Sequence, residues 1–264
     1  PYLMSADVQA RADVEQLVTY DLAVGQSYET RHLSLRASAV RGQCKLSFST
    51  LVNGGTVCGS YDVHLVDAAP FVTIQTEVRD VNATKNIQPQ LARYFPGNTV
   101  YGYFNRTEEL ALALRDMLAN SIDSRYALRP RGNSRTVTLD GLVEGRAAPR
   151  FVTRIFPGLN LTKYRYRKMT GFAEHKTDGS TYNDMVFDGY KYDLYMEGTT
   201  DAKNIGRYEV GLILLGTPQS AEWNHKYRQG RIPILKIKAR IEGGKMYDEE
   251  VRYHRPDETA YIIF

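Results

Sequence analysis

Apolar and polar residues alternate along most of this 264-residue chain. Such alternation places apolar side chains on one face of a β-strand and polar side chains on the other. The clearest case is the segment 235–241, LKIKARI, which has three basic residues on its polar face. Similar runs occur at residues 33–36, 44–49, 61–65, 190–196, 208–214 and 260–264, with Gly, Asn, Asp and Pro between them. The pattern predicts a mainly β protein, an antiparallel β-sandwich or barrel, as one β-rich domain over residues 1–264.

Two segments depart from this period and predict helices. In residues 5–19, apolar side chains recur at mixed three- and four-residue steps after a potential N-cap, Ser5. In residues 107–121, leucines mix with charged residues, and Thr107 is a suitable N-cap. The two glutamates that follow it would lie in the first turn, where the helix dipole favours negative charge. We therefore expect helices at about residues 5–19 and 107–121.

The two cysteines, Cys44 and Cys58, flank a predicted turn at residues 53–55 (NGG) and would lie on the two strands of one hairpin. Pairing about this turn places Cys44 opposite about residue 64, which leaves Cys58 roughly 20 Å away along the partner strand. A disulfide needs Cα atoms within about 7 Å of each other. The sequence therefore predicts two free thiols, which suits a reducing compartment.

A short motif recurs in the chain. Residues 68–73, AAPFVT, return with one insertion as residues 147–153, AAPRFVT, and each copy is followed by an Asn-X-Thr-Lys sequence. A duplicated β unit would explain the repeat, with halves at about residues 20–122 and 123–264. A recurrent turn-then-strand solution explains it nearly as well, so both interpretations stay open.

No catalytic motif is present in the sequence. It lacks the glycine-rich phosphate loops, the paired Cys and His spacings of zinc sites and the G-x-S-x-G elbow of serine hydrolases. We therefore expect no catalytic residue, metal or cofactor. Four carboxylates cluster in sequence at Asp184, Asp188, Asp193 and Glu197. Their four- and five-residue steps do not place all four carboxylates on the same face of one strand. A solvated strand edge is therefore a simpler interpretation than a site of paired acids.

Positive charge is concentrated in residues 122–168. Eleven basic residues oppose three acidic ones there, a net charge of +8, whereas the whole chain carries +4. Segregated charge of this kind favours contact with a polyanion or with an acidic protein face. The candidate polyanion or subunit contacts are Arg125, Arg129, Arg131, Arg135, Arg150, Arg154, Lys163, Arg165, Arg167 and Lys168.

Within this segment, residues 164–167 read Tyr-Arg-Tyr-Arg. On a strand, both tyrosines would lie on one face and both arginines on the other. A platform for single-stranded nucleic acid needs aromatic and basic groups on the same face, so the pattern argues against a stacking groove. Arginine also pairs with carboxylates across subunit boundaries. Assembly thus explains the segment as well as nucleic acid does, and a solvated surface remains the simplest interpretation.

These features favour a non-enzymatic structural protein that associates with copies of itself or with other assembly subunits, as a virion component of a capsid or of a phage head or tail. The richness in tyrosine, with 19 Tyr against 9 Phe and 1 Trp, suits strand faces and protein interfaces. The alternative is a nucleic-acid-binding protein that uses the Arg-rich segment, including a metal-dependent nuclease built on Asp184, Asp188 or Asp193.

The sequence predicts no membrane partner. No stretch reaches the roughly 18 apolar residues of a spanning helix. Phe264 and every second residue before it would lie on the same strand face, and these residues are apolar at only three positions before a charged one follows. The segment that begins at Pro1 has neither a basic flank nor an apolar run, so no secretory signal is expected, and the expected location is the cytoplasm or a virion.

Overall fold

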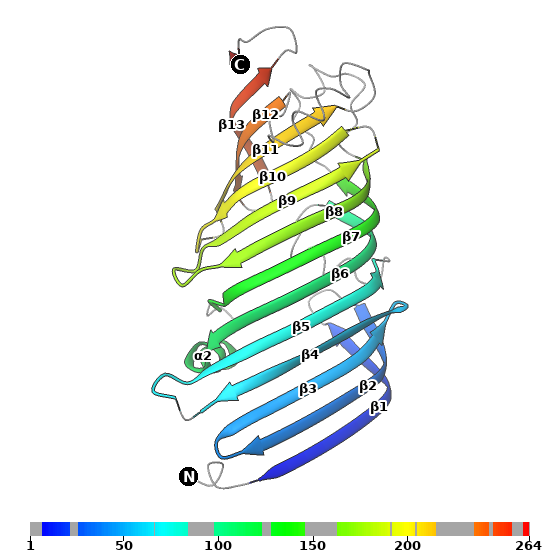
Figure 1. Cartoon of the computed structure of the whole chain (residues 1–264), viewed down its shortest axis with the longest axis vertical. Helices are drawn as coiled ribbons and strands as arrows, with labels where there is room; N and C mark the ends of the chain where they lie inside the picture. Colours follow the sequence, from blue (N-terminus) through cyan, green and yellow to red (C-terminus); the bar gives the residue numbers. More distant parts are fainter. Residues whose placement is uncertain are drawn as a thin grey trace. The chain divides into compact units, whose positions relative to one another are not determined.

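The fold is described from a computed structural model for residues 7–21, 26–65, 67–83, 98–122, 128–145, 163–190, 192–203, 205–214, 235–242, 245–254 and 261–263. Strands dominate this part of the chain (Figure 1). The first seven strands are β1 (Val8–Asp21), β2 (Gln26–Val40), β3 (Gln43–Val52), β4 (Gly55–His64), β5 (Phe71–Asn82), β6 (Asn98–Ala113) and β7 (Arg131–Gly145). The others are β8 (Lys163–His175), β9 (Thr181–Gly189), β10 (Tyr192–Thr200), β11 (Gly206–Leu214), β12 (Leu235–Glu242), β13 (Lys245–His254) and β14 (Tyr261–Ile263).

The chain divides into two compact units. The first comprises Pro1–Pro89, Tyr103–Thr136 and Glu174–Gly179, and the second comprises Gln90–Gly102, Val137–Ala173 and Ser180–Phe264. Within each unit, strands that are neighbours in the chain are antiparallel neighbours in the sheet (Figure 1). The prediction of a mainly β, antiparallel protein with few helices is confirmed. The finer choice between sandwich and barrel stays a prediction. So does the duplication, since the second copy of the repeated motif lies outside the described residues.

The predicted helix at residues 5–19 is wrong, because Val8–Asp21 forms strand β1. Its register with β2 runs from the pair Val8↔Ala39 to the pair Asp21↔Gln26. Residues 8–15, VQARADVE, alternate apolar and polar with a period of two, which is the strand pattern. The apolar spacing resembled that of a helix for a simple reason. Most of the apolar residues lie on one face of the strand, and one further apolar residue, Leu17, lies on the other face.

The predicted helix at residues 107–121 is correct only in its second half. Helix α2 spans Leu114–Ile122, and it is the one helix in the described part of the chain. Thr107 does not cap it, because Thr107 lies in β6 opposite Glu77 of β5. Leu110 and Leu112 are two residues apart, so both point to one face of that strand. The helix begins where the main-chain N–H of Leu114 donates to the carbonyl of Pro70 at 3.0 Å.

The hairpin that carries the two cysteines is present. Asn53 and Gly54 both have positive φ, at 46° and 82°, which is the geometry of a two-residue turn that matches the twist of its strands. Cys44 lies opposite Val63, one position from the prediction. Cys58 lies opposite Ser49. Both cysteines are free, so the predicted absence of a disulfide between them is confirmed.

The registers of the first unit align its apolar side chains into two rows that cross six strands. One row is Ala10, Ala37, Leu46, Tyr61, Ile74 and Leu110, and the other is Val8, Ala39, Cys44, Val63, Val72 and Leu112. We call these two rows the apolar face of the first unit. The residues between them in sequence point the other way and are mostly polar, so the sheet of β1–β6 is amphipathic.

The second unit buries its apolar side chains in a core. Leu212, Leu235 and Ile237 of β11 and β12 are buried there beneath aromatic side chains. The aromatic layer consists of Tyr164, Tyr166, Tyr192 and Phe187. Tyr164 stacks on Tyr192 with ring centroids 4.9 Å apart. Alternation along β12 thus places its apolar residues inside, as the sequence predicts, with Lys238 exposed on the other face.

Candidate functional site

Strand β8 carries the Tyr-Arg-Tyr-Arg motif that the sequence singles out. Tyr164 and Tyr166 are buried, whereas Arg165 and Arg167 are exposed. The predicted separation of tyrosines and arginines onto opposite faces is therefore confirmed. The exposed face holds no aromatic layer from this motif on which bases could stack.

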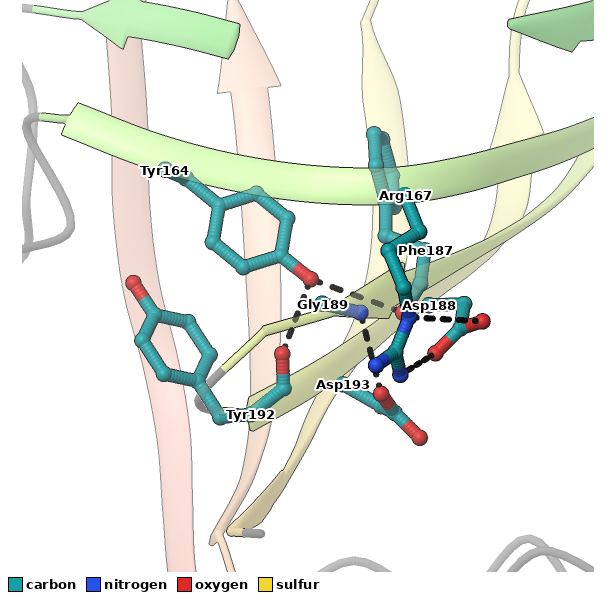
Figure 2. Close-up of polar contacts among 7 residues, drawn as sticks. All are labelled: Tyr164, Arg167, Phe187, Asp188, Gly189, Tyr192 and Asp193. Atoms are coloured by element: carbon teal, nitrogen blue, oxygen red, sulfur yellow. Dashed lines mark hydrogen bonds and ion pairs between the residues drawn. The ribbon is translucent and has the colours of Figure 1, made fainter. Parts of the chain in front are cut away.

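The tyrosine side of β8 is tied into the core by hydrogen bonds. The hydroxyl of Tyr164 donates to the carbonyl of Tyr192 at 3.0 Å and approaches the carbonyl of Phe187 at 3.5 Å (Figure 2). The hydroxyl of Tyr166 is 2.9 Å from that of Thr138, which is fully buried. Burial, assisted by the negative charge of Asp193, raises the pKa of Tyr164 well above its usual value. These hydroxyls stay protonated and hold strands together, so we assign them a structural role.

The basic side of β8 is partly neutralised. The guanidinium of Arg167 forms a two-pronged pair with the carboxylate of Asp188, with an Nη2–Oδ1 distance of 2.6 Å (Figure 2). Lys163 Nζ lies 3.1 Å from a carboxylate oxygen of Glu144. Arg165 and Lys168 are exposed and form no ion pair within the described part of the chain. These two cations are the part of the strand that is open to an external anion.

The other predicted basic contacts lie on other segments of the chain. Arg131 and Arg135 lie on β7, in the first unit, and are exposed, as is Arg129 just before that strand. Arg125, Arg150 and Arg154 lie outside the described residues. Of the seven predicted contact residues that the structure describes, four lie on the one strand β8, namely Lys163, Arg165, Arg167 and Lys168.

The four clustered carboxylates share one face of the β9–β10 hairpin, which corrects our interpretation of their spacing. A four-residue step is even, so Asp184 and Asp188 stay on the same face of β9. Glu197 lies directly opposite Asp184 on the neighbouring strand. The five-residue step crosses the turn between the two strands, so it does not change the face.

Each of these carboxylates already has a structural partner, and none is free. Asp193 is buried and accepts the main-chain N–H of Gly189 at 3.0 Å (Figure 2). Glu197 accepts the hydroxyl of Tyr182 at 2.6 Å. Within the described ranges, no group of three His, Cys, Asp or Glu side chains is placed to hold a metal ion. The arrangement is that of a braced hairpin.

The most unusual surface is one that the sequence reasoning missed, namely the apolar face of the first unit. Along its second row, Val8 on β1 is 52% exposed, whereas Leu112 on β6 is only 5% exposed. Leu46 on β3 is 39% exposed. Burial of the face is therefore deepest at Val72 and Leu112, on β5 and β6, and its exposure is greatest at Val8, on β1. The period of two in residues 8–15 would have revealed it, had that segment been assigned to a strand.

The opposite face of the same strands is polar and internally paired. Arg11 Nε lies 2.7 Å from Asp13 Oδ2, and the hydroxyl of Ser34 donates to Asp13 at 2.8 Å. Lys45 and Asp62 pair across β3 and β4 at 3.3 Å. This face suits water, so the apolar face is the one that needs a cover.

Comparison of the chain with protein-family models, with curated proteins and with solved structures gives no match. No helix within the described ranges has both the length and the apolar character needed to cross a membrane.

Proposed function

We propose that this chain is a non-enzymatic assembly subunit that associates with copies of itself through the apolar face of its first unit. The observation that supports the proposal is the exposure of that face at β1–β3, where Val8 and Leu46 remain in contact with water. A sheet with one apolar face is stable in water only when that face is covered. Contiguous exposed apolar surface is a common mark of protein interfaces.

The second unit supports the proposal by contrast. There, aromatic side chains of the same chain cover the apolar strands, and Leu235 is almost fully buried. Within the described residues, the first unit has no comparable aromatic cover over β1–β3. A second copy offers a face of the same chemistry, and burial of both faces together removes apolar surface from water on each side.

A virion shell or tail is the setting that we propose for such a subunit. Such assemblies are built from repeated copies of β-rich subunits that contact one another through several surfaces. The braced carboxylates of the β9–β10 hairpin support a structural role, since Asp188 and Glu197 already have partners within the fold.

Contact with a polyanion through β8 is a second candidate function. It is favoured by the exposure of Arg165 and Lys168 on β8. Cations that have no carboxylate partner in the described structure can exchange their counterions for phosphates at little cost. This contact would be electrostatic and independent of sequence, because both tyrosines of the motif are buried.

The experiment for the main proposal compares two leucine substitutions by sedimentation over a range of concentrations. Leu46→Ser removes an exposed leucine from the apolar face. Its burial at an interface is worth about 1.5 kcal/mol, so association should weaken about tenfold. Leu118→Ser is the matched control, because Leu118 is 56% exposed but belongs to α2 and to neither row of the apolar face. If both variants associate as strongly as the wild type, the apolar face is not the contact.

A further inference from the structure

Strand β1 is an open edge of the sheet. Among the described strands it pairs with β2 alone. It is 14 residues long, VQARADVEQLVTYD, and contains no Pro, Gly or Lys. Natural proteins usually protect an edge with such residues, with bulges or with short strands, because the unpaired main-chain groups can bind another strand. The register of β1 against β2 has no bulge.

The side chains of one β1 strand are complementary to those of a second, antiparallel copy of β1. In an antiparallel pair of identical strands centred on Ala12, Arg11 of each copy lies opposite the partner's Asp13, on the polar face. Ala10 then lies opposite the partner's Val14, on the apolar face. Two ion pairs and matched apolar contacts result from one two-fold axis.

Neighbouring registers are less favourable. Centring on Arg11 places two arginines opposite each other, and centring on Asp13 does the same with two aspartates. Like charges directly opposite each other destabilise a strand pair. A one-residue slip places the polar face of one copy against the apolar face of the other. Centring on Asp13 also places Arg11 opposite the partner's Glu15. Of these three registers, the one centred on Ala12 is therefore the one that forms ion pairs without placing like charges opposite each other.

We propose that β1 pairs antiparallel with β1 of a second copy, about a two-fold axis at Ala12. This inference rests on the proposed function and names a second contact for it. Edge pairing joins two sheets side by side, and their apolar faces lie on the same side and become continuous. The joined face is then free to stack on another pair. A subunit with two such contacts can build assemblies larger than a dimer.

The polar residues at the seam are already arranged for this contact. The carboxylate of Asp13 accepts hydrogen bonds from Ser34 and Arg11, and these hold the pKa of Asp13 below its usual value. Asp13 is therefore ionised at neutral pH and fixed on the outer strand. Arg11 lies beside it on the same edge, at 2.7 Å, where it can contact the partner's carboxylate as well.

The first test is a charge exchange. Arg11→Asp and Asp13→Arg each place like charges opposite each other in the proposed register, so each variant alone should lose edge pairing, by about tenfold or more in dissociation constant. An equimolar mixture of the two restores both ion pairs, so it should associate as the wild type does. Circular dichroism checks that each variant is folded. Failure of the mixture to recover association overturns the inference.

The second test is a cross-link across the axis. In a background of Cys44→Ser and Cys58→Ser, Ala12→Cys places two thiols directly opposite each other, with Cα atoms about 5 Å apart. Mild oxidation should give a covalent dimer. Gln9→Cys is the control, because the two copies of residue 9 would lie about 20 Å apart. Equal cross-linking of both variants contradicts the register.

The outcomes separate this inference from the proposed function. If the wild type associates while the charge variants associate equally well and Ala12→Cys does not cross-link, the edge contact is wrong and self-association stands. If the wild type is monomeric at every concentration, both are wrong.

Discussion

Tyrosine residues organise the second unit through glycines that make room for them. A Cβ atom at Gly141 of β7 would overlap the ring of Tyr166, and one at Gly211 of β11 would overlap the ring of Tyr195. In each case the tyrosine ring covers the main chain of the glycine. This contact stabilises the strand at a glycine, a residue that otherwise weakens strands. The sequence shows the abundance of tyrosine but not these pairs, because strand pairing decides which glycine lies under which ring.

Replacement of Gly141 tests this packing. Gly141→Val should lower the free energy of unfolding by about 2 kcal/mol or more, since the buried Tyr166 ring cannot leave its site without breaking its hydrogen bond with Thr138. Chemical denaturation measures the change. Leu139→Val, at an exposed position on the same strand, should change stability by about 0.5 kcal/mol or less. Equal effects of the two substitutions would contradict the account.

Alkaline pH should destabilise the protein through its buried tyrosines. Burial raises the pKa of Tyr192 to about 12, from a usual value of 10.0. The folded pKa is raised, so the stabilising contribution is complete below pH 10 and is lost as pH rises through 12. Denaturation at pH 9 and pH 11 should show a fall in stability that is smaller in Tyr192→Phe. Tyr103→Phe, at an exposed position, should fall as the wild type does. An unchanged fall in Tyr192→Phe would contradict the assignment.

At the scale of the element, the sequence predicts strands well where one face is buried. Residues 235–241 alternate cleanly because the core of the second unit covers one face of β12. The errors fall at β1 and β6. The described side chains of β1 are not buried, so its alternation of apolar and polar residues is less strict. Leu17 on its polar face adds an apolar residue at a spacing typical of a helix. β6 continues directly into α2, so its leucines at alternate positions merge with those of the helix.

The candidate site was predictable only in part, for a similar reason. The sequence predicts which residues lie on each face of β8, because alternation is a property of a single strand. The partners of its basic residues, Asp188 for Arg167 and Glu144 for Lys163, lie on other strands. Their positions follow from how β7, β8 and β9 are placed in the fold, which a single sequence does not specify.

Strand β8 provides a prediction of its own. If the second candidate function holds, single-stranded nucleic acid should bind with an affinity that falls steeply with salt. The double variant Arg165→Ala/Lys168→Ala should lower the salt slope by about 1 to 2, through loss of two phosphate contacts. Fluorescence anisotropy measures both. Arg36→Ala, at an exposed arginine of β2, is the control. Binding that ignores salt, or an unchanged slope in the double variant, would remove this candidate.

The whole molecule combines one unit that covers its apolar strands with one that leaves them partly open. The contrast lies between Leu235, buried in the second unit, and Val8, exposed in the first. In the proposed assembly, the second unit supplies most of the apolar burial within one chain and the first unit supplies the contact surface. The second unit has its own core, whereas the first gains further apolar burial only when another surface covers β1–β3.

The molar mass of the wild-type protein in solution tests this account most directly. Light scattering over a wide range of concentrations should give masses well above the 29.9 kDa of one chain, and these should fall toward that value on dilution. A mass of one chain at every concentration would contradict the account, because the apolar face of the first unit would then be covered without a second copy.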